Sequence, residues 1–246
     1  MTNEKHTDRF SKKNNRFKSL VMPLLLLGTW LVFYLIEPRF GSAGNISNLL
    51  RQASILAIAA YAQTFVVISG GTDLSTGANA ALTTMISAIV AKEHGVIAGF
   101  SAGLLTGTVL GLINGTLVAY LKVPAFIATV GMFIYGRSIA WYLGGGLPIE
   151  MMPPGYQTLG GGFFLGIPIP IIISIVLLLP LHFILNKTKF GRYLYSLGSN
   201  EATAKLSGIN VNLNRLGAFV MSGFLGGLAG IILSSRVNSG QPGIYP

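Results

Sequence analysis

Seven long apolar runs follow one another along the chain, with only short polar links between them. They cover approximately residues 20–36, 52–71, 75–91, 95–121, 123–143, 167–185 and 216–234. About 20 apolar residues are needed to cross a bilayer as one helix, so the chain has room for about seven such spans. We therefore predict an all-α fold, a polytopic transmembrane helical bundle in which about seven helices cross the lipid.

The composition excludes most other classes of protein. Charged residues make up only 10% of the 246 residues, and the mean hydropathy is +0.64. Soluble domains carry about 25% charged residues, so this chain has too few to cover a surface that faces water. The 32 glycines follow no triplet period, which excludes collagen, and the absence of cysteine excludes disulfides and thiolate metal sites. His6, His94 and His182 lie far apart, and we expect no metal site.

The net charge of +10 is concentrated in two segments, residues 1–18 and 186–215, which together hold eight of the ten excess positive charges. Each segment adjoins an apolar run, as the positive-inside rule expects of cytoplasmic loops, and neither is typical of a nucleic-acid groove. With the N-terminus inside, twelve basic residues fall inside and four outside. We predict a cytoplasmic basic tail at 1–19 and a transmembrane domain at 20–246 with a cytoplasmic loop at 186–215.

A polar break interrupts the apolar sequence between residues 68 and 77. Gly70 and Gly71 can end a helix there, and Asp73 or Ser75 can cap the next one. Broken helices at membrane depth are tolerated only where protein buries them or where they line a cavity. Asp73 is therefore either a simple cap at a cytoplasmic turn or a functional acid.

Five glycines recur at every fourth position in the 95–121 run. This spacing predicts a seam where another helix approaches closely, which is a structural interpretation. Asn114 lies beside the seam and needs partners at this depth, so it is either a link between helices or a group on a solute path. The glycines are Gly99, Gly103, Gly107, Gly111 and Gly115.

The 186–215 loop contains the signals of one short helix. Asn200 is a favourable N-cap, Glu201 suits the first turn and Gly208 suits the C-terminal end. A helix of about two turns is unstable alone, so it needs a surface to dock against. Ala202 and Leu206, with Ile209 following, offer a small apolar surface for a cytoplasmic partner, or alternatively for the membrane.

Three ordered motifs resemble a known family. The loop GRYLYSLGSNEATAKLSGINV is similar to the coupling-loop signature of the permease subunits of bacterial sugar ABC importers, and above all to the ribose-type permeases (the ribose, xylose and arabinose family). The segments SGGTDLSTG at 69–77 and GLINGTLVAYLKVPAFIATVGM at 111–132 agree in the same order. The resemblance extends from about residue 20 to residue 242.

The resemblance implies a multi-pass protein of the bacterial cytoplasmic membrane that is not itself an enzyme and has no catalytic residues. A second permease copy, a cytoplasmic ABC ATPase and an extracytoplasmic sugar-binding protein are the implied partners, and ribose or a related monosaccharide is the implied cargo. ATP and magnesium are expected on the ATPase, with no cofactor in this chain, which also lacks a P-loop motif. The implied ATPase-coupling residues are Gly191, Arg192, Gly198, Asn200, Glu201, Ala202 and Gly208. The implied sugar-path residues are Asp73, Ser75, Asn114, Phe126 and Thr129.

Three alternatives to this reading stay open. Family members continue past the segment SSRVNSGQPGIYP with further helices, so we expect the chain to be C-terminally truncated relative to the family. It is then a fragment, the product of a disrupted gene or a protein completed by a second chain, and an inactive truncated permease is one alternative. A stand-alone secondary transporter or facilitator is another. A membrane-embedded enzyme is disfavoured, because no acid pair or metal cluster falls within the spans.

Overall fold

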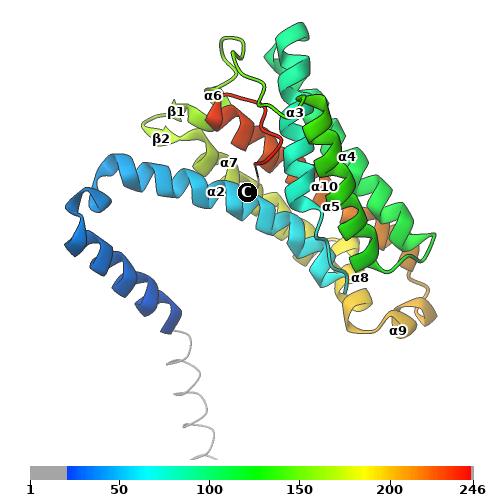
Figure 1. The fold of residues 1–246 in the computed structure, drawn as a ribbon. Coiled ribbons are helices and arrows are strands. Elements are labelled where there is room, and N and C mark those ends of the chain that lie inside the picture. The colour runs from blue at the N-terminus through cyan, green and yellow to red at the C-terminus, as the bar shows by residue number, and fades with distance from the viewer. Residues whose placement is uncertain (1–20, 245–246) are drawn as a thin grey trace, which may run out of the picture. The chain divides into compact units, whose positions relative to one another are not determined.

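The computed structural model describes residues 21–244, and helices account for most of them. The basic tail predicted at residues 1–19 lies outside the described residues. Figure 1 shows the order of the elements along the chain. They are the helix Val21–Ile36, the 3-10 helix η1 Pro38–Gly41, and then α2 Ala43–Ile68, α3 Thr76–His94, α4 Val96–Ala119, α5 Ala125–Leu143, α6 Thr158–Gly161, β1 Phe163–Phe164, β2 Ile167–Pro168, α7 Ile169–Lys187, α8 Lys189–Ser199, α9 Glu201–Leu206 and α10 Val211–Val237.

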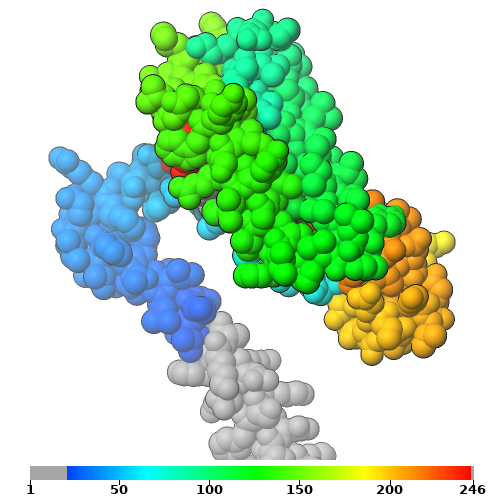
Figure 2. Space-filling model, turned by 45° about the vertical axis from the view of Figure 1, so that its right-hand side comes forward, coloured from blue at the N-terminus to red at the C-terminus, as the bar shows by residue number. Residues whose placement is uncertain are grey.

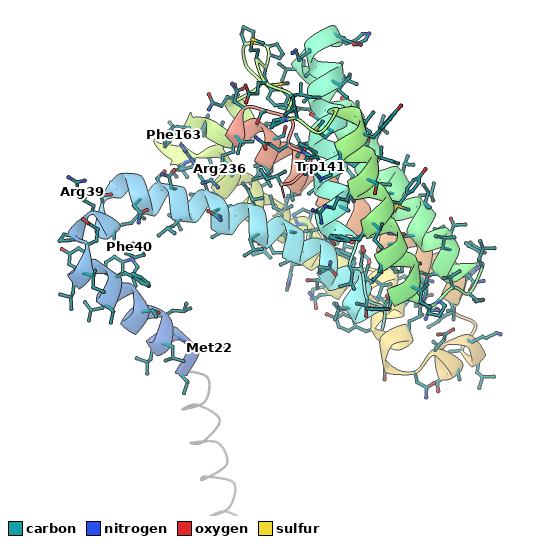
Figure 3. All side chains as sticks on the ribbon, viewed as in Figure 1. Met22, Arg39, Phe40, Trp141, Phe163 and Arg236 are labelled. Carbon is teal, nitrogen blue, oxygen red and sulfur yellow. The ribbon has the colours of Figure 1, made fainter. Side chains whose placement is uncertain are left out.

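The described chain forms two compact units, residues 21–49 and residues 50–244. In the first unit, the helix Val21–Ile36 exposes nearly all of its large apolar side chains. An aromatic cluster closes the turn that follows, where Phe40 lies 5.4 Å from Phe33 and 6.4 Å from Trp30 between ring centroids. Figure 3 shows Phe40 and Arg39 at this turn. Such exposed apolar surface is suited to lipid and unsuited to water.

Helix α10 packs against both α4 and α3 in the second unit (Figure 1). The glycine seam predicted on α4 faces this contact. A Cβ atom placed on Gly107 would lie 2.6 Å from the Gly223 carbonyl oxygen and 2.7 Å from the Gly227 Cα of α10. Gly103 and Gly99 continue the seam against Ser87 of α3. The interpretation of the seam as a packing surface is therefore confirmed, and its partner on α10 is a second set of glycines, Gly223 and Gly227.

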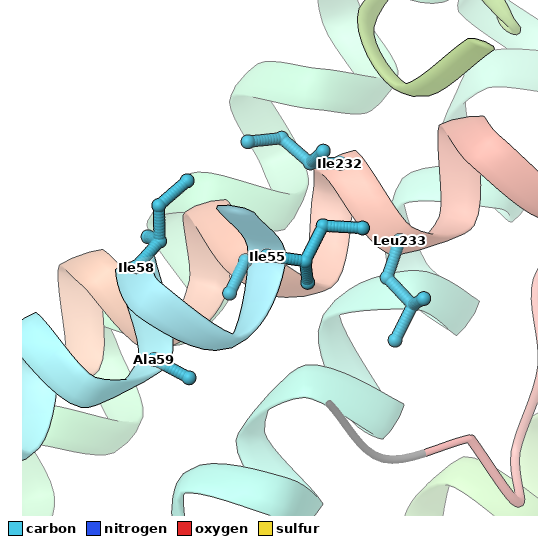
Figure 4. Close-up of a cluster of buried hydrophobic side chains, with 6 residues drawn as sticks. Ile55, Ile58, Ala59, Ile232 and Leu233 are labelled. Carbon is cyan, nitrogen blue, oxygen red and sulfur yellow. The ribbon is translucent and has the colours of Figure 1, made fainter. Parts of the chain in front are cut away.

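An apolar cluster joins α2 to α10. Ile55, Ile58 and Ala59 of α2 pack against Ile232 and Leu233 of α10, as Figure 4 shows. All five side chains are buried. Their packing fixes the second half of α2 on the bundle through close dispersion contacts, which are the main attraction available between helices in lipid.

All seven predicted spans coincide with helices. Among the described residues, five of them are long and apolar enough to cross a membrane, namely α2, α4, α5, α7 and α10. The helix Val21–Ile36 is shorter, and α3 is more polar because its buried face carries Asn79, Thr83, Thr84 and Ser87. These polar groups are tolerated because other helices surround them.

The segment between α5 and α7 contains little regular structure. It contains the short helix α6 and an antiparallel hairpin in which Phe163 pairs with Pro168. Tyr156 from this segment is fully buried, and its hydroxyl lies 3.1 Å from Ser87 Oγ and 2.6 Å from Ser234 Oγ. The segment is thus anchored between α3 and α10, and Figure 3 shows Phe163 on its hairpin.

Different connecting segments contact one another at the two ends of the second unit. At one end, Lys122 between α4 and α5 donates to Asn212 Oδ1 at the start of α10 (2.6 Å). At the other end, Lys92 donates to the Glu150 carbonyl (3.2 Å). Lys122 therefore lies beside the predicted cytoplasmic loop at 186–215, to which Asn212 belongs, whereas Lys92 lies beside the segment between α5 and α7.

Candidate functional site

The polar break lies between α2 and α3, where the glycine pair predicts it. Gly70 has a φ of +79°, a left-handed conformation that favours glycine, and its amide donates to the Val67 carbonyl (3.0 Å). Helix α2 ends at Ile68, and α3 does not begin until Thr76. The intervening residues are irregular and bring Asp73 into the interior of the bundle, where it is only 5% exposed.

Three donors surround the Asp73 carboxylate. Its Oδ1 accepts from the Ser75 amide (2.9 Å) and the Ser75 hydroxyl (2.6 Å), and its Oδ2 accepts from the Ser222 hydroxyl of α10 (2.7 Å). Ser75 occupies the N-cap position of α3 but makes no side-chain capping bond. Asp73 therefore links the break to α10, and its role goes beyond a local cap.

Asn114 of α4 joins the same group of polar side chains. Its amide donates to Ser75 Oγ (2.8 Å), and the residue is 1% exposed. Its side-chain oxygen, Oδ1, is buried and has no hydrogen-bond partner among residues 21–244. An unsatisfied buried acceptor costs about 1–3 kcal/mol, so this oxygen favours an arrangement in which a donor reaches it.

We call Asp73, Ser75, Asn114 and Ser222 the Asp73 cluster. Thr129 of α5 is buried beside the break, with its hydroxyl 3.5 Å from the Thr72 carbonyl and 2.8 Å from the Ala125 carbonyl. Phe126 lies one turn earlier and is 60% exposed. The structure thus brings Asp73, Ser75 and Asn114 together and places Thr129 near them, whereas Phe126 lies on the exposed side of α5.

Three polar residues at this site were not identified from the sequence. Gln63 of α2 donates to the Asp73 carbonyl and to Thr76 Oγ1, each at 2.5 Å. Asn79 of α3 donates to the Gly223 carbonyl (3.1 Å), and Ser222 holds Asp73 as described. Each is a polar side chain inside an otherwise apolar run, which is a signal that sequence reading could have used.

Helix α8 was also not predicted. Thr188 caps it by accepting from the Gly191 amide (3.3 Å), and the buried residues Leu194 and Leu197 form one face. Leu194 packs with Phe65 of α2, so α8 lies on the bundle as an amphipathic helix. The loop predicted at 186–215 is therefore mostly helical.

Helix α9 follows directly and confirms the predicted short helix. The Asn200 side chain accepts from the Thr203 amide (3.0 Å), and the chain leaves the helix through Gly208 with a φ of +77°. Ala204 faces inward and packs with Leu197 and Val211. This contact supplies the docking surface that a helix of this length needs.

An ion pair attaches α9 to α10. Arg215 Nη2 lies 2.7 Å from Glu201 Oε2. The hydrogen bond from the Arg215 guanidinium holds the pKa of the Glu201 carboxyl below its ordinary value, so the pair is charged at neutral pH. Because Glu201 is about half exposed, the pair orients the helix more than it stabilises the fold.

The outward face of α9 differs from the expected one. Ala202 and Leu206 are exposed, and Leu206 is 90% exposed. Ile209 packs against Leu197 and Ala204, so its inclusion in the exposed surface was wrong. The reason is that the chain turns at Gly208 and directs the next residue inward. Figure 2 shows α8 and α9, in yellow and orange, at one end of the second unit.

The seven predicted coupling residues fall into two groups. Arg192, Asn200, Glu201, Ala202 and Gly208 are exposed on α8 or α9. Gly191 is buried and Gly198 is exposed, and both also contact the ends of other helices. A Cβ on Gly191 would overlap the carbonyl oxygens of the last turns of α7, and one on Gly198 would overlap the Ile68 carbonyl oxygen of α2.

Comparison with known proteins identifies the family. The family model described as the branched-chain amino acid transport system/permease component matches residues 45–245. The ribose import permease of Haemophilus influenzae is 40% identical over 239 residues, which cover 95% of this chain and 72% of that protein. The ribose import permease of Bacillus subtilis is 36% identical, covering 96% of this chain and 73% of its own length.

A third relative is the L-arabinose ABC transporter permease of Azospirillum brasilense, 33% identical over 93% of this chain and 67% of that protein. No solved structure matches the chain. The helical fold, the apolar helices and these relatives agree with a multi-pass protein of the cytoplasmic membrane. The chain belongs to the branched-chain amino acid transport system/permease component family of ABC importer permeases, and within that family it is similar to the ribose-type sugar permeases.

Proposed function

We propose that this chain is the membrane-spanning subunit of an ATP-driven importer for ribose or a closely related monosaccharide. In this assembly two copies of the chain form the pathway, a sugar-binding protein delivers the sugar from outside and a cytoplasmic ABC ATPase supplies the energy. ATP and magnesium bind to the ATPase, and the chain itself performs no chemistry.

The observation that carries the proposal is the similarity to ribose import permeases along almost the whole chain. The arabinose permease among the relatives supports a monosaccharide and leaves the choice of pentose to experiment. A stand-alone transporter driven by ions usually places several ionisable groups at membrane depth. Here Asp73 has serine donors at both carboxylate oxygens, which favours a structural and pathway role over ion coupling.

Helix α9 is the proposed contact with the ATPase. It projects Ala202 and Leu206 from a base held by Ala204 and by the pair of Glu201 with Arg215. A short helix with an exposed apolar side chain, flanked by charges, is suited to insertion into a groove of a partner. The exposed apolar tip of α9, formed by Ala202 and Leu206, is small, so the contact with the ATPase depends on a few side chains.

The Asp73 cluster is the proposed polar lining of the sugar path. A sugar presents many hydroxyl donors, and the unpartnered Oδ1 of Asn114 is an acceptor that one of them can satisfy. The cluster lies where α2 is interrupted and where α3, α4 and α10 meet. Opening of the bundle at this point would expose polar groups that hydrogen bond to a sugar. Their binding would be weak enough for the sugar to be released quickly.

Co-purification with the cognate ATPase tests the docking proposal. Leu206→Asp places a charge at the centre of the exposed tip, and we expect it to reduce ATPase recovery strongly, because the apolar contact is replaced by a desolvated carboxylate. Leu147→Asp is the matched control, since Leu147 is exposed at the opposite end of the unit. Unchanged recovery with Leu206→Asp, at normal membrane levels of the protein, would overturn docking through α9.

Uptake of labelled ribose tests the cargo and the energy source. Vesicles containing the chain, the cognate ATPase and the sugar-binding protein should accumulate ribose with ATP and not with ADP. Unlabelled arabinose and galactose then measure the specificity by competition. Equal uptake without ATP or without the ATPase would favour a facilitator, and absence of uptake despite ATPase association would favour an inactive chain.

A further inference from the structure

We propose that Gly198 is a positioning residue that joins the α8–α9 element to the helix break at Asp73, so that movement of α9 reaches the Asp73 cluster through a contact between two backbones. The inference rests on the proposed function for the source of that movement. It assigns Gly198, which is exposed on one side, a contact within this chain in place of the ATPase contact that the family resemblance implies.

The contact itself is close. A Cβ on Gly198 would overlap the Ile68 carbonyl oxygen and would lie 3.3 Å from the Gly70 amide nitrogen. Conversely, a Cβ on Gly70 would lie 3.4 Å from the Gly198 Cα. Both sides of the contact are therefore backbone atoms at the last residue of α2 and at the turn that follows it. Backbone atoms cannot move aside as a flexible side chain can, so a movement of α8 toward the end of α2 displaces that end.

The other side of Gly198 is tied to α9. Leu197, which precedes it, packs with Ala204 of α9 and with Val211. The Asn200 amide donates to the Ser196 carbonyl (3.0 Å) and so continues the backbone hydrogen bonding from α8 to the cap of α9. A force on the exposed Leu206 is thereby transmitted to α8 through packed atoms.

The break carries the displacement onward. Gly70 is three residues before Asp73, and the Gln63 side chain of α2 donates to the Asp73 carbonyl, so the irregular segment is bonded to the helix that Gly198 contacts. A second link reaches the same carboxylate from α10, because Arg215 pairs with Glu201 and Ser222 bonds to Asp73. Arg215 and Ser222 are seven residues apart, or about two helical turns.

The Asp73 carboxylate is thus the point where the two links from α9 meet. A shift of α9 that moves the break relative to α10 separates Asp73 from Ser222, while Ser75 moves with Asp73. Asn114 stays on α4, so its bond to Ser75 is the second bond that such a shift strains. The cluster therefore has one arrangement with these two bonds formed and another in which their donors and acceptors are available to a sugar.

Substitution of Gly198 tests this proposal in the assembled importer. Gly198→Ala should retain the ATPase in co-purification while the ratio of ribose transported to ATP hydrolysed falls about tenfold, which corresponds to about 1.4 kcal/mol of overpacking. Gly131→Ala is the matched control, because a Cβ on Gly131 meets no atom within 4 Å. An unchanged ratio with Gly198→Ala would overturn the inference, whereas loss of ATPase association in the unmodified protein would overturn the proposed function instead.

A distance measurement keeps the test independent of whether Gly198→Ala folds. Spin labels at Leu206→Cys and Leu74→Cys report on α9 and the break, and a label at Ile134→Cys of α5 is the reference; all three side chains are exposed. The 206–74 distance should stay constant between the ADP and ATP states of the assembly, while the 206–134 distance changes. A 206–74 distance that changes as much as the 206–134 distance, or distances that are all constant, would overturn the proposal.

Discussion

Gly107→Ala tests whether the glycine seam sets the distance between α4 and α10. The new Cβ would lie 2.6 Å from the Gly223 carbonyl oxygen and 2.7 Å from the Gly227 Cα, and both are backbone atoms. Carbon contacts are favourable near 3.5 Å, so the helices must separate by about 1 Å, which forfeits about a quarter to a half of each dispersion contact across the crossing. Overpacking of this kind costs about 1–3 kcal/mol.

The comparison with Gly131→Ala isolates that cost. Both substitutions gain the same intrinsic helix propensity, about 1 kcal/mol, but Gly131 has open space around it. The free energy of unfolding can be measured by SDS titration of the detergent-solubilised protein, followed by the fluorescence of Trp30 and Trp141. We expect Gly107→Ala to be about 1–3 kcal/mol less stable than Gly131→Ala. Equal stability of the two variants would refute the argument that α4 and α10 approach through their glycines.

Three further predictions follow from the described contacts. Ser222→Ala removes the donor to Asp73 Oδ2 and should lower the free energy of unfolding by about 1–3 kcal/mol in the same titration; no change would mean that the bond is not formed. Tyr156→Phe removes a buried hydroxyl between two serines and should cost about 1–2 kcal/mol, whereas an unchanged midpoint would argue against this anchor. Arg215 lowers the pKa of Glu201, so the ion pair is fully formed above the ordinary carboxyl pKa and orients α9 on α10 there. The ion pair is lost as the pH falls through the lowered pKa of Glu201. A carboxyl NMR titration should therefore give a lower midpoint for Glu201 than in Arg215→Gln, and equal midpoints would contradict the ion pair.

The features that the sequence predicts correctly depend on neighbouring residues. Gly70 ends α2 in a left-handed conformation that favours glycine, and Asn200 starts α9 by accepting from an amide three residues later. The glycine spacing on α4 likewise defines one face of a helix whatever its partner is. Such signals are local, so they can be read without knowledge of the fold.

The features that the sequence does not predict depend on contacts between distant segments. Ser222 reaches Asp73 across 149 positions, and nothing in the surrounding residues specifies that pairing. In the sequence Ile209 follows the exposed Ala202 and Leu206, yet the turn at Gly208 packs it against Leu197 and Ala204. The family resemblance implies that Gly198 is an ATPase-coupling residue, and only the position of the α2 carboxyl end shows its contact with the Ile68 carbonyl.

The most direct test of the account asks which side of the membrane α9 faces and what covers it. The chain has no native cysteine, so Leu206→Cys provides a single reactive thiol on a side chain that is 90% exposed. If α9 faces the cytoplasm, a membrane-impermeant maleimide should modify this thiol in inside-out vesicles and should not modify it in sealed cells. Binding of the cognate ATPase should block the modification in the vesicles. Modification from outside sealed cells, or equal modification with and without bound ATPase, would contradict the proposed contact of α9 with the ATPase.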